Sequence, residues 1–399
     1  MNLKQKIIFS LGAGYAQVPY FLEIKKLGYK ILACDKNPKA PGKNLVDYFE
    51  NSSSHNLKRN LMLAKKYNRQ FTIHKVVALT TGVPVLDAAI IGKKIGIDSL
   101  SIDEAKFSVD KYFLRETLKN IGWSKLTFAK TKDLASAKKF LSAVGKCFLK
   151  PNFGGMGSGW VVKITNEEEL TKYFLKVCAS SRDGYCYLEE TAGGIEYKVS
   201  TIWHESKLKF LSFEKALYDT KTGIVNGHAL GKLPSKTRLI DNVTLEELFK
   251  LLKLEPGPVG LDLIVGPKGF EILDIEFVLS DCHLGIEHCS NYNLYKNEAR
   301  TLVGENVEKF GGFLGACAVR RFLFPSQKLK TLKKINLKFS LKKYKGLINT
   351  VLDEWIHGKI NTVYGKYQFQ GYFVTGGRTQ EETIQRSDSV YQSFLTKIS

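Results

Sequence analysis

Long apolar runs are missing from the sequence, and no stretch approaches the roughly 18 residues that a membrane-spanning helix needs. The first apolar segment, Lys4–Gly12, resembles the apolar part of a signal peptide. It is short, however, and it leads into a Gly-x-Gly turn, so a first buried strand is the better interpretation. We therefore expect a cytoplasmic protein with no membrane partner.

Cysteine is scarce and poorly spaced for a disulfide or metal framework. The chain has seven cysteines, an odd number, and none of them forms a Cys-x-x-Cys pair. This usage is typical of reduced thiols in a large cytosolic protein. Cys282-His283 and His288-Cys289 leave three alternatives open: a zinc site, a polar substrate-site role for His283, and ordinary structural use. Structural use is favoured, because adjacent residues of an extended chain rarely face one metal.

Arginine is also scarce, although the formal net charge is +21. Only ten of the 60 basic residues are arginine, and the lysines are spread along the chain. Base readout and bidentate phosphate contacts favour arginine over lysine. A lysine-rich solvated surface is therefore the first interpretation, and attraction of anionic substrates is the second. Nucleic acid is disfavoured as a partner.

The composition otherwise matches that of a folded protein with several domains, with 44% hydrophobic and 25% charged residues in a chain of 399. Residues 1–106 alternate between strand and helix patterns, which predicts a parallel sheet with right-handed crossovers. Gly12-Ala13-Gly14 followed by Asp35 is a partial nucleotide fingerprint that lacks the third glycine. A tight strand-to-helix turn is the better interpretation.

The most informative stretch is a glycine-rich loop between two apolar strands. Phe148-Leu149-Lys150-Pro151 ends a strand, and glycines follow at 154, 155, 157 and 159. Glycine permits backbone torsions that other residues disfavour and lets N–H groups approach an anion closely. The pattern predicts a flap over nucleotide phosphates, with Lys150 as an added charge. A plain glycine hairpin is the alternative.

Two acidic segments follow. In Tyr187–Glu196, a strand runs into a connecting segment that can present Glu189 to adenine N6 and Glu196 to ribose hydroxyls. Further along, Asp262, Asp274 and Glu276 lie in two apolar strands around a turn, and the alternation of a strand places Asp274 and Glu276 on one face. Clustered carboxylates in an apolar hairpin are costly without cations, and magnesium with ATP phosphates supplies such cations.

Taken in order, these features resemble the ATP-grasp superfamily over residues 1–300, in its carboxylate–amine ligase and biotin-carboxylase-like branches. The resemblance implies that Lys111 and Lys150 bind phosphates and take part in catalysis, and His283 is the third catalytic candidate. It implies a nucleotide site formed by Lys111, Lys150, Gly154, Gly155, Met156, Gly157, Ser158, Glu189, Glu190, Thr191, Ala192 and Glu196. It implies that Asp262, Asp274 and Glu276 bind Mg²⁺, with Mn²⁺ as an alternative.

The chain departs from the family pattern at the metal strand. That strand usually reads Glu-x-Asn-x-Arg, whereas this chain has Asp274-Ile275-Glu276-Phe277-Val278. Glutamate in place of asparagine adds negative charge at the metals. The arginine that often helps to bind an acidic substrate is replaced by Val278.

The resemblance also sets the expected fold, an α/β and α+β chain. An N-terminal Rossmann-like parallel-sheet domain precedes a two-lobed ATP-grasp fold and a small C-terminal α+β region. We expect the N-terminal domain at residues 1–106, the lobe with the glycine-rich phosphate loop at 107–185, the lobe with the magnesium carboxylates at 186–304, and the C-terminal region at 305–399.

The implied activity is that of an ATP- and magnesium-dependent ligase. Such an enzyme converts a carboxylate to an acyl phosphate and joins it to an amine or similar nucleophile, with release of ADP and phosphate. Its expected partners are small-molecule carboxylate and amine substrates, and a homodimer is left open. The alternatives are an ATP-dependent carboxylase acting through carboxyphosphate and a non-catalytic nucleotide- or nucleic-acid-binding protein.

Overall fold

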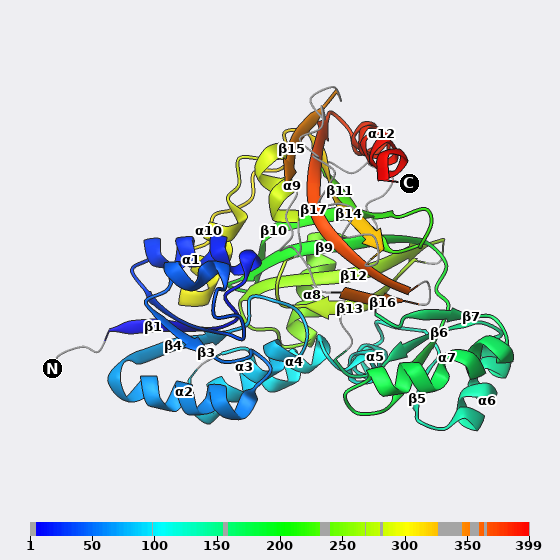
Figure 1. The fold of residues 1–399 in the computed structure, drawn as a ribbon, viewed down its shortest axis with the longest axis horizontal. Helices are drawn as coiled ribbons and strands as arrows, with labels where there is room; N and C mark the ends of the chain where they lie inside the picture. Colours follow the sequence, from blue (N-terminus) through cyan, green and yellow to red (C-terminus); the bar gives the residue numbers. More distant parts are fainter. Residues whose placement is uncertain are drawn as a thin grey trace.

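The computed structural model describes residues 5–97, 99–154, 159–231, 240–267, 269–279, 282–325, 345–351, 359–362 and 365–398. Within these ranges the chain forms one parallel and two antiparallel sheets. Figure 1 shows the parallel sheet at the lower left, the smaller antiparallel sheet at the lower right, and the large antiparallel sheet above and between them.

The N-terminal parallel sheet has the order β3-β2-β1-β4. Its strands are buried on both faces, since Ile8 packs on one side and Ile7 and Phe9 on the other. Helix α1 covers the first face, and α2 and α3 cover the second. The elements are β1 (Lys6–Leu11), α1 (Val18–Lys26), β2 (Lys30–Asp35), β3 (Tyr48–Asn51), α2 (Leu57–Gln70), β4 (Thr72–Val77) and α3 (Val83–Lys94).

The Gly-x-Gly turn after β1 is held by side chains of the same domain. Asp35 accepts hydrogen bonds from Ala13 N at 3.0 Å and from Asn37 N at 2.8 Å. Gln17 accepts one from Gly14 N at 2.8 Å, and Gly12 has φ of +120°, a torsion that favours glycine. Because these donors are already used, the turn interpretation fits better than the partial nucleotide fingerprint.

The smaller antiparallel sheet has the order β5-β8-β6-β7 and is covered by α6 and α7. Its core contains Leu149, Ile164 and Leu188 from the strands and Leu141 and Phe174 from the helices. The elements are β5 (Phe128–Thr131), α6 (Leu134–Val144), β6 (Cys147–Pro151), β7 (Val162–Ile164), α7 (Glu167–Ser180) and β8 (Cys186–Glu190).

The large antiparallel sheet has the order β13-β12-β9-β10-β11-β14-β17-β15, with β16 paired to β17. Helix α8 packs on one face of β9 and β12, and α9 packs on the opposite face of β9. Its strands are β9 (Ile195–His204), β10 (Lys207–Tyr218), β11 (Val225–Gly231), β12 (Gly257–Gly266), β13 (Gly269–Glu276), β14 (Ala316–Pro325), β15 (Leu347–Val351), β16 (Lys359–Thr362) and β17 (Gly365–Gly377). Its helices are α8 (Asn242–Leu251), α9 (Cys282–Cys289), α10 (Leu294–Val303) and α12 (Gln380–Ile398).

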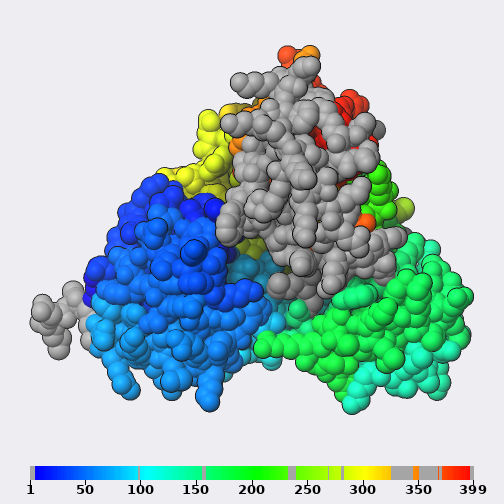
Figure 2. All heavy atoms as spheres, in the orientation of Figure 1, coloured from blue at the N-terminus to red at the C-terminus, as the bar shows by residue number. Residues whose placement is uncertain are grey.

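The hydrophobic clusters cross the predicted domain boundaries. Helices α4 (Ile102–Phe107) and α5 (Lys111–Asn120) precede the smaller sheet, yet Leu114 and Leu118 of α5 pack with α8 and β12. Ala299 of α10 packs with the N-terminal domain. Figure 2 nevertheless shows the N-terminal domain (blue) and the small-sheet lobe (green) on opposite sides of the base of the molecule. The four predicted ranges stay a prediction.

The described residues contain no helix that is both long and apolar enough to cross a membrane. The side chains of six of the seven cysteines are described, and all six are buried thiols. Cys178 and Cys186 belong to the core of the small-sheet lobe, and Cys289 and Cys317 to the core beneath α9.

We predict that Asp87→Asn stabilises the protein more at pH 8 than at pH 4. Asp87 lies on α3 and is 4% exposed, and no described residue donates a hydrogen bond to its Oδ2. Burial raises its pKa to about 6, although Arg182 opposes the rise. The folded state therefore binds the proton of the Asp87 carboxyl more tightly than the unfolded state does, so ionisation of Asp87 lowers the free energy of unfolding as pH rises through 6. At pH 8, Asp87→Asn should raise the free energy of unfolding by about 3 kcal/mol, measured by urea unfolding.

The matched control is Asp103→Asn, because the Asp103 side chain is 75% exposed and pairs with Lys106 on the surface. This control should leave the free energy of unfolding nearly unchanged at both pH values. A gain from Asp87→Asn that is equal at pH 4 and pH 8 would contradict the assigned burial of the ionised carboxylate.

Candidate active site

A buried ion network lies where the small sheet meets the large one. Lys150 on β6 and Glu189 on β8 occupy neighbouring antiparallel strands, and Glu189 is 2% exposed. The Glu189 carboxylate accepts hydrogen bonds from Lys150 Nζ, from Arg115 Nη2 at 3.0 Å and from Tyr187 OH at 2.8 Å. Burial alone would raise the pKa of Glu189, but Lys150 and Arg115 lower it to about 2. The carboxylate is therefore ionised and holds Lys150 in place.

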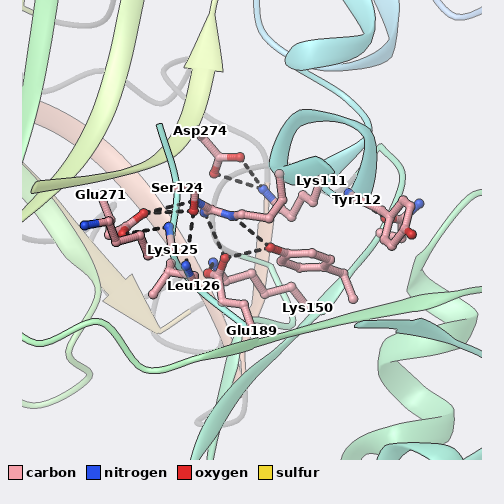
Figure 3. Close-up of polar contacts among 12 residues, drawn as sticks. Lys111, Tyr112, Ser124, Lys125, Leu126, Lys150, Glu189, Glu271 and Asp274 are labelled. Carbon is pink, nitrogen blue, oxygen red and sulfur yellow. Dashed lines mark hydrogen bonds and ion pairs between the residues drawn. The ribbon is translucent and has the colours of Figure 1, made fainter. Parts of the chain in front are cut away.

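Arg115 extends this network to the large sheet. Its Nη1 donates to Ser124 Oγ at 3.0 Å and lies 3.7 Å from Glu271 Oε2 on β13. Ser124 Oγ in turn donates to Glu271 Oε2 at 2.9 Å, and Lys125 N donates to Oε1 at 3.2 Å. Figure 3 shows Ser124, Lys125 and Glu271 on one side of the cluster and Glu189 with Lys150 on the other. Arg115 thus couples the two sheets.

Lys111 reaches the same region from the start of α5. Asp110 caps this helix by accepting a hydrogen bond from Phe113 N at 3.1 Å, which fixes Lys111 at the first helical position. Lys111 Nζ lies 2.6 Å from Asp274 Oδ1 and 2.9 Å from Oδ2 (Figure 3). Burial would lower the pKa of Lys111, but Asp274 raises it above the ordinary value.

The three predicted metal carboxylates lie on one face of the β12–β13 hairpin. Asp262 is the direct cross-strand partner of Asp274, and Glu276 pairs with Gly260 two positions further along. The intervening Leu261 and Ile275 point into the opposite core. Burial raises the pKa of Asp262 to about 7; Lys198 opposes this rise, and the Glu276 and Asp274 carboxylates add to it.

Lys198 is a site residue that sequence reasoning missed. It lies on β9 directly opposite Asp262, and its side chain is 8% exposed. Its Nζ lies 2.6 Å from Glu276 Oε2 and 3.6 Å from Asp262 Oδ1. Burial would lower the pKa of Lys198, but Asp262 and Glu276 raise it well above the ordinary value. The sequence feature that could have identified Lys198 is its position two residues after Glu196, which places both side chains on one face of the strand.

The predicted nucleotide residues are placed as follows. Glu196 accepts a hydrogen bond from Tyr218 OH at 2.6 Å. Glu190 ends β8, Thr191 and Ala192 follow it, and all three are partly exposed. Thr191 Oγ1 is nevertheless buried with no hydrogen-bond partner among the described residues. Gly154 has φ of +72°, and its N–H donates to Val109 O at 2.8 Å. Gly155, Met156, Gly157 and Ser158 lie outside the described residues.

His283 lies on α9, where it contacts the N-terminal domain and α10. Its Nε2 is 2.5 Å from Glu298 Oε1 and 3.1 Å from Tyr20 OH, and its ring stacks on Tyr295. Cys289, by contrast, donates to Gly285 O at 3.1 Å. His283 and Cys289 therefore bind separate partners, which speaks against the zinc alternative. The predicted catalytic role of His283 stays a prediction.

The donor set fits a magnesium ion in its chemistry, because Asp262, Asp274 and Glu276 offer only carboxylate oxygens, which Mg²⁺ prefers. In the arrangement seen here, however, Lys111 and Lys198 form ion pairs with these carboxylates. Within the described part of the chain, no group of three or more histidine, cysteine, aspartate or glutamate side chains is arranged to hold a metal ion. Metal binding would require the lysines to move.

The fold is similar to that of several solved enzymes. Phosphoribosylglycinamide synthetase from Anaerococcus prevotii matches with a TM-score of 0.66 and 16% identity, covering 97% of each chain. L-amino acid ligase from Bacillus licheniformis matches with a TM-score of 0.72 and 14% identity, covering 97% of this chain and 98% of that one. N5-carboxyaminoimidazole synthetase from Staphylococcus aureus, complexed with ADP, matches with a TM-score of 0.75 and 15% identity, covering 98% of each chain.

No protein-family model matches the sequence, and no curated protein sequence matches it either. The likeness to the solved enzymes extends over nearly the whole of both chains. It confirms the predicted fold class, and the chain has the ATP-grasp fold. The roles of the individual site residues stay predictions.

We predict that Arg115→Met lowers the free energy of unfolding by about 3–5 kcal/mol, because it leaves the buried Glu189 carboxylate without one of its two cations. The change should be measured by urea unfolding at pH 7. The effect should weaken at acidic pH, since the ion pair contributes fully above pH 4.5 and is lost as pH falls through about 2, the folded pKa of Glu189.

Lys26→Met is the matched control, because Lys26 forms a surface pair with Glu23 and its side chain is 68% exposed. Its effect should stay within about 0.5 kcal/mol. In a double-mutant cycle, Arg115→Met and Glu189→Gln should be less damaging together than the sum of the two single changes. Strict additivity would refute the coupling between the two side chains.

Proposed function

We propose that the chain is an ATP- and magnesium-dependent ligase that joins a carboxylate to an amine or similar nucleophile and releases ADP and phosphate. The observation that carries this proposal is the convergence of Lys111, Lys150 and three carboxylates at the junction of the two antiparallel sheets. The ATP-grasp fold supports it, as does the ADP that accompanies the similar Staphylococcus aureus enzyme.

In this proposal the nucleotide lies between the small sheet and the large sheet. Lys150 and Lys111 bind its phosphates, and Gly154–Ser158 covers them. The segment Glu190–Ala192 faces adenine, and Glu196 binds the ribose hydroxyls. The predicted contact of Glu189 with adenine stays open, but its carboxylate already accepts bonds from three donors. Glu189 is therefore better suited to position Lys150 than to contact the base.

Asp262, Asp274 and Glu276 would hold the magnesium. When bound, the metal neutralises charge on the phosphoryl group that is transferred. The protein contributes by holding the phosphates and the reacting carboxylate in line, so no nucleophilic side chain is required.

The proposed reaction has two steps. The substrate carboxylate attacks the terminal phosphorus of ATP, which forms an acyl phosphate and releases ADP. The amine then attacks the acyl carbon, and phosphate leaves. His283 remains a candidate for the acceptor region, since α9 packs on the face of β9 that also carries Lys198. A homodimer and a cytoplasmic location belong to the same proposal.

Calorimetry with ATP and magnesium tests the nucleotide site, and an ADP-release screen across carboxylate–amine pairs tests the activity. Bicarbonate belongs in that screen, because bicarbonate-dependent ADP release would favour the carboxylase acting through carboxyphosphate. A folded sample that binds no ATP in the presence of magnesium would refute the proposal.

We predict that Asp274→Asn combined with Glu276→Gln lowers ADP formation by about 100-fold or more, because the metal loses two charged ligands where phosphoryl charge must be neutralised. The rate should be measured at saturating ATP with the carboxylate found in the screen. The near-isosteric amides retain hydrogen-bonding oxygens for Lys111 and Lys198, so the variant should remain folded in a melting experiment.

The control is Glu205→Gln, since Glu205 is an exposed acid that pairs with Lys209 on the surface. It should leave the rate of ADP formation unchanged. Near-normal turnover by the folded Asp274→Asn, Glu276→Gln variant would remove both residues from the catalytic site.

A further inference from the structure

Lys198 occupies the middle of a row of charged residues that crosses four strands. Glu214 on β10 is its direct partner on one side, and Asp262 on β12 is its direct partner on the other. Asp274 on β13 continues the row beyond Asp262. One lysine therefore stands among acidic residues on a face where three acids have been assigned to a metal. No motif in the sequence assigned Lys198 to this site.

The side chain of Lys198 reaches Glu276 by passing over Gly260. A Cβ atom built on Gly260 would lie 3.5 Å from Lys198 Cε and 3.8 Å from Glu276 Cβ, so the lysine lies close to this part of the strand. The ammonium group ends 2.6 Å from Glu276 Oε2. A magnesium ligand would need that oxygen at about 2.0–2.1 Å from the ion. The ammonium group and a divalent cation cannot occupy the same position on Glu276, because their charges repel.

A displaced Lys198 would have polar surroundings on the same sheet face. Ser200 follows two residues later on β9, and its cross-strand partner is Ser212 on β10. Ser212 is 1% exposed, and its Oγ has no hydrogen-bond partner among the described residues. A buried hydroxyl without a partner usually marks a place that a ligand or an ordered water occupies.

We propose that Lys198 is an exchangeable counter-cation. Without a divalent ion it holds Glu276 and Asp262. A divalent ion displaces it, and the freed ammonium group then binds the anionic end of the carboxylate substrate beside Ser212. This inference rests on the proposed function, because it needs the metal site on β12 and β13. No covalent step is involved.

The first test measures Mn²⁺ affinity with ADP present, by the electron paramagnetic resonance signal of free Mn²⁺. Lys198→Gln removes the competing charge and should tighten Mn²⁺ binding about tenfold. Lys198→Arg keeps the charge and should remain near the wild-type affinity. Lys209→Met is the matched control, because Lys209 pairs with the exposed Glu205, and it should have no effect. Equal or weaker Mn²⁺ binding by folded Lys198→Gln would overturn the inference.

A second measurement uses the wild-type protein and does not depend on the folding of a variant. Lysine acetylation, read by mass spectrometry, should be severalfold faster at Lys198 with Mn²⁺ and ADP than with ADP alone, because the ion pairs with Glu276 and Asp262 are broken. Lys209 is the internal reference. An unchanged rate at Lys198 would also overturn the inference. Wild-type protein that binds no Mn²⁺ with ADP would instead refute the proposed function.

A kinetic comparison tests the last step, the contact with substrate. With the carboxylate found in the ADP-release screen, Lys198→Gln should raise the KM for that carboxylate more than the KM for ATP, and Lys198→Arg should restore part of the loss. A merely structural role would change both constants together. Equal changes in the two constants would therefore overturn the assigned contact.

Discussion

The geometry of the site depends on the ion pairs that Arg115 forms with a carboxylate of each antiparallel sheet. The side chain of Arg115 is 1% exposed, and its guanidinium group lies between the Glu189 carboxylate of the small sheet and the Glu271 carboxylate of the large one. Buried charges are tolerated only when they are paired and hydrogen-bonded. Any displacement of one sheet relative to the other would therefore leave one of these buried charges without its ion-pair partner. This constraint sets the position of Glu189, and through Glu189 that of Lys150.

Pairing of charges also determines the arrangement around the carboxylates of the β12–β13 hairpin. Lys111 balances Asp274, and Lys198 balances Glu276 and Asp262. Three carboxylates therefore share two ammonium groups. In the proposed magnesium site, a divalent cation bound by these carboxylates would change which partner each lysine has. The proposal thus links metal binding to the positions of both lysines.

Local patterns predicted much of the fold. The apolar segment Lys4–Gly12 contains the expected first buried strand, which is β1. Strand alternation placed Asp274 and Glu276 on one face. Partners that are distant in sequence could not be predicted. Arg115 meets Glu271 across 156 positions, and nothing in the local sequence of either residue identifies the other. Strands β14 and β17 extend the large sheet because β14 pairs with β11 and β17 pairs with β14, and no local pattern indicates these partners.

Strand β13 lacks the arginine of the ATP-grasp pattern, and a lysine on β9 provides a positive charge at the same carboxylates. Glu276 adds a negative charge to the strand, and Val278 is 7% exposed and brings no positive charge. Lys198 supplies that charge from β9, on the far side of β12, because the register places it opposite Asp262 and its side chain reaches Glu276. In the proposed exchange, Lys198 would release the carboxylates from β9, which is a separate strand from the β12–β13 hairpin that carries them.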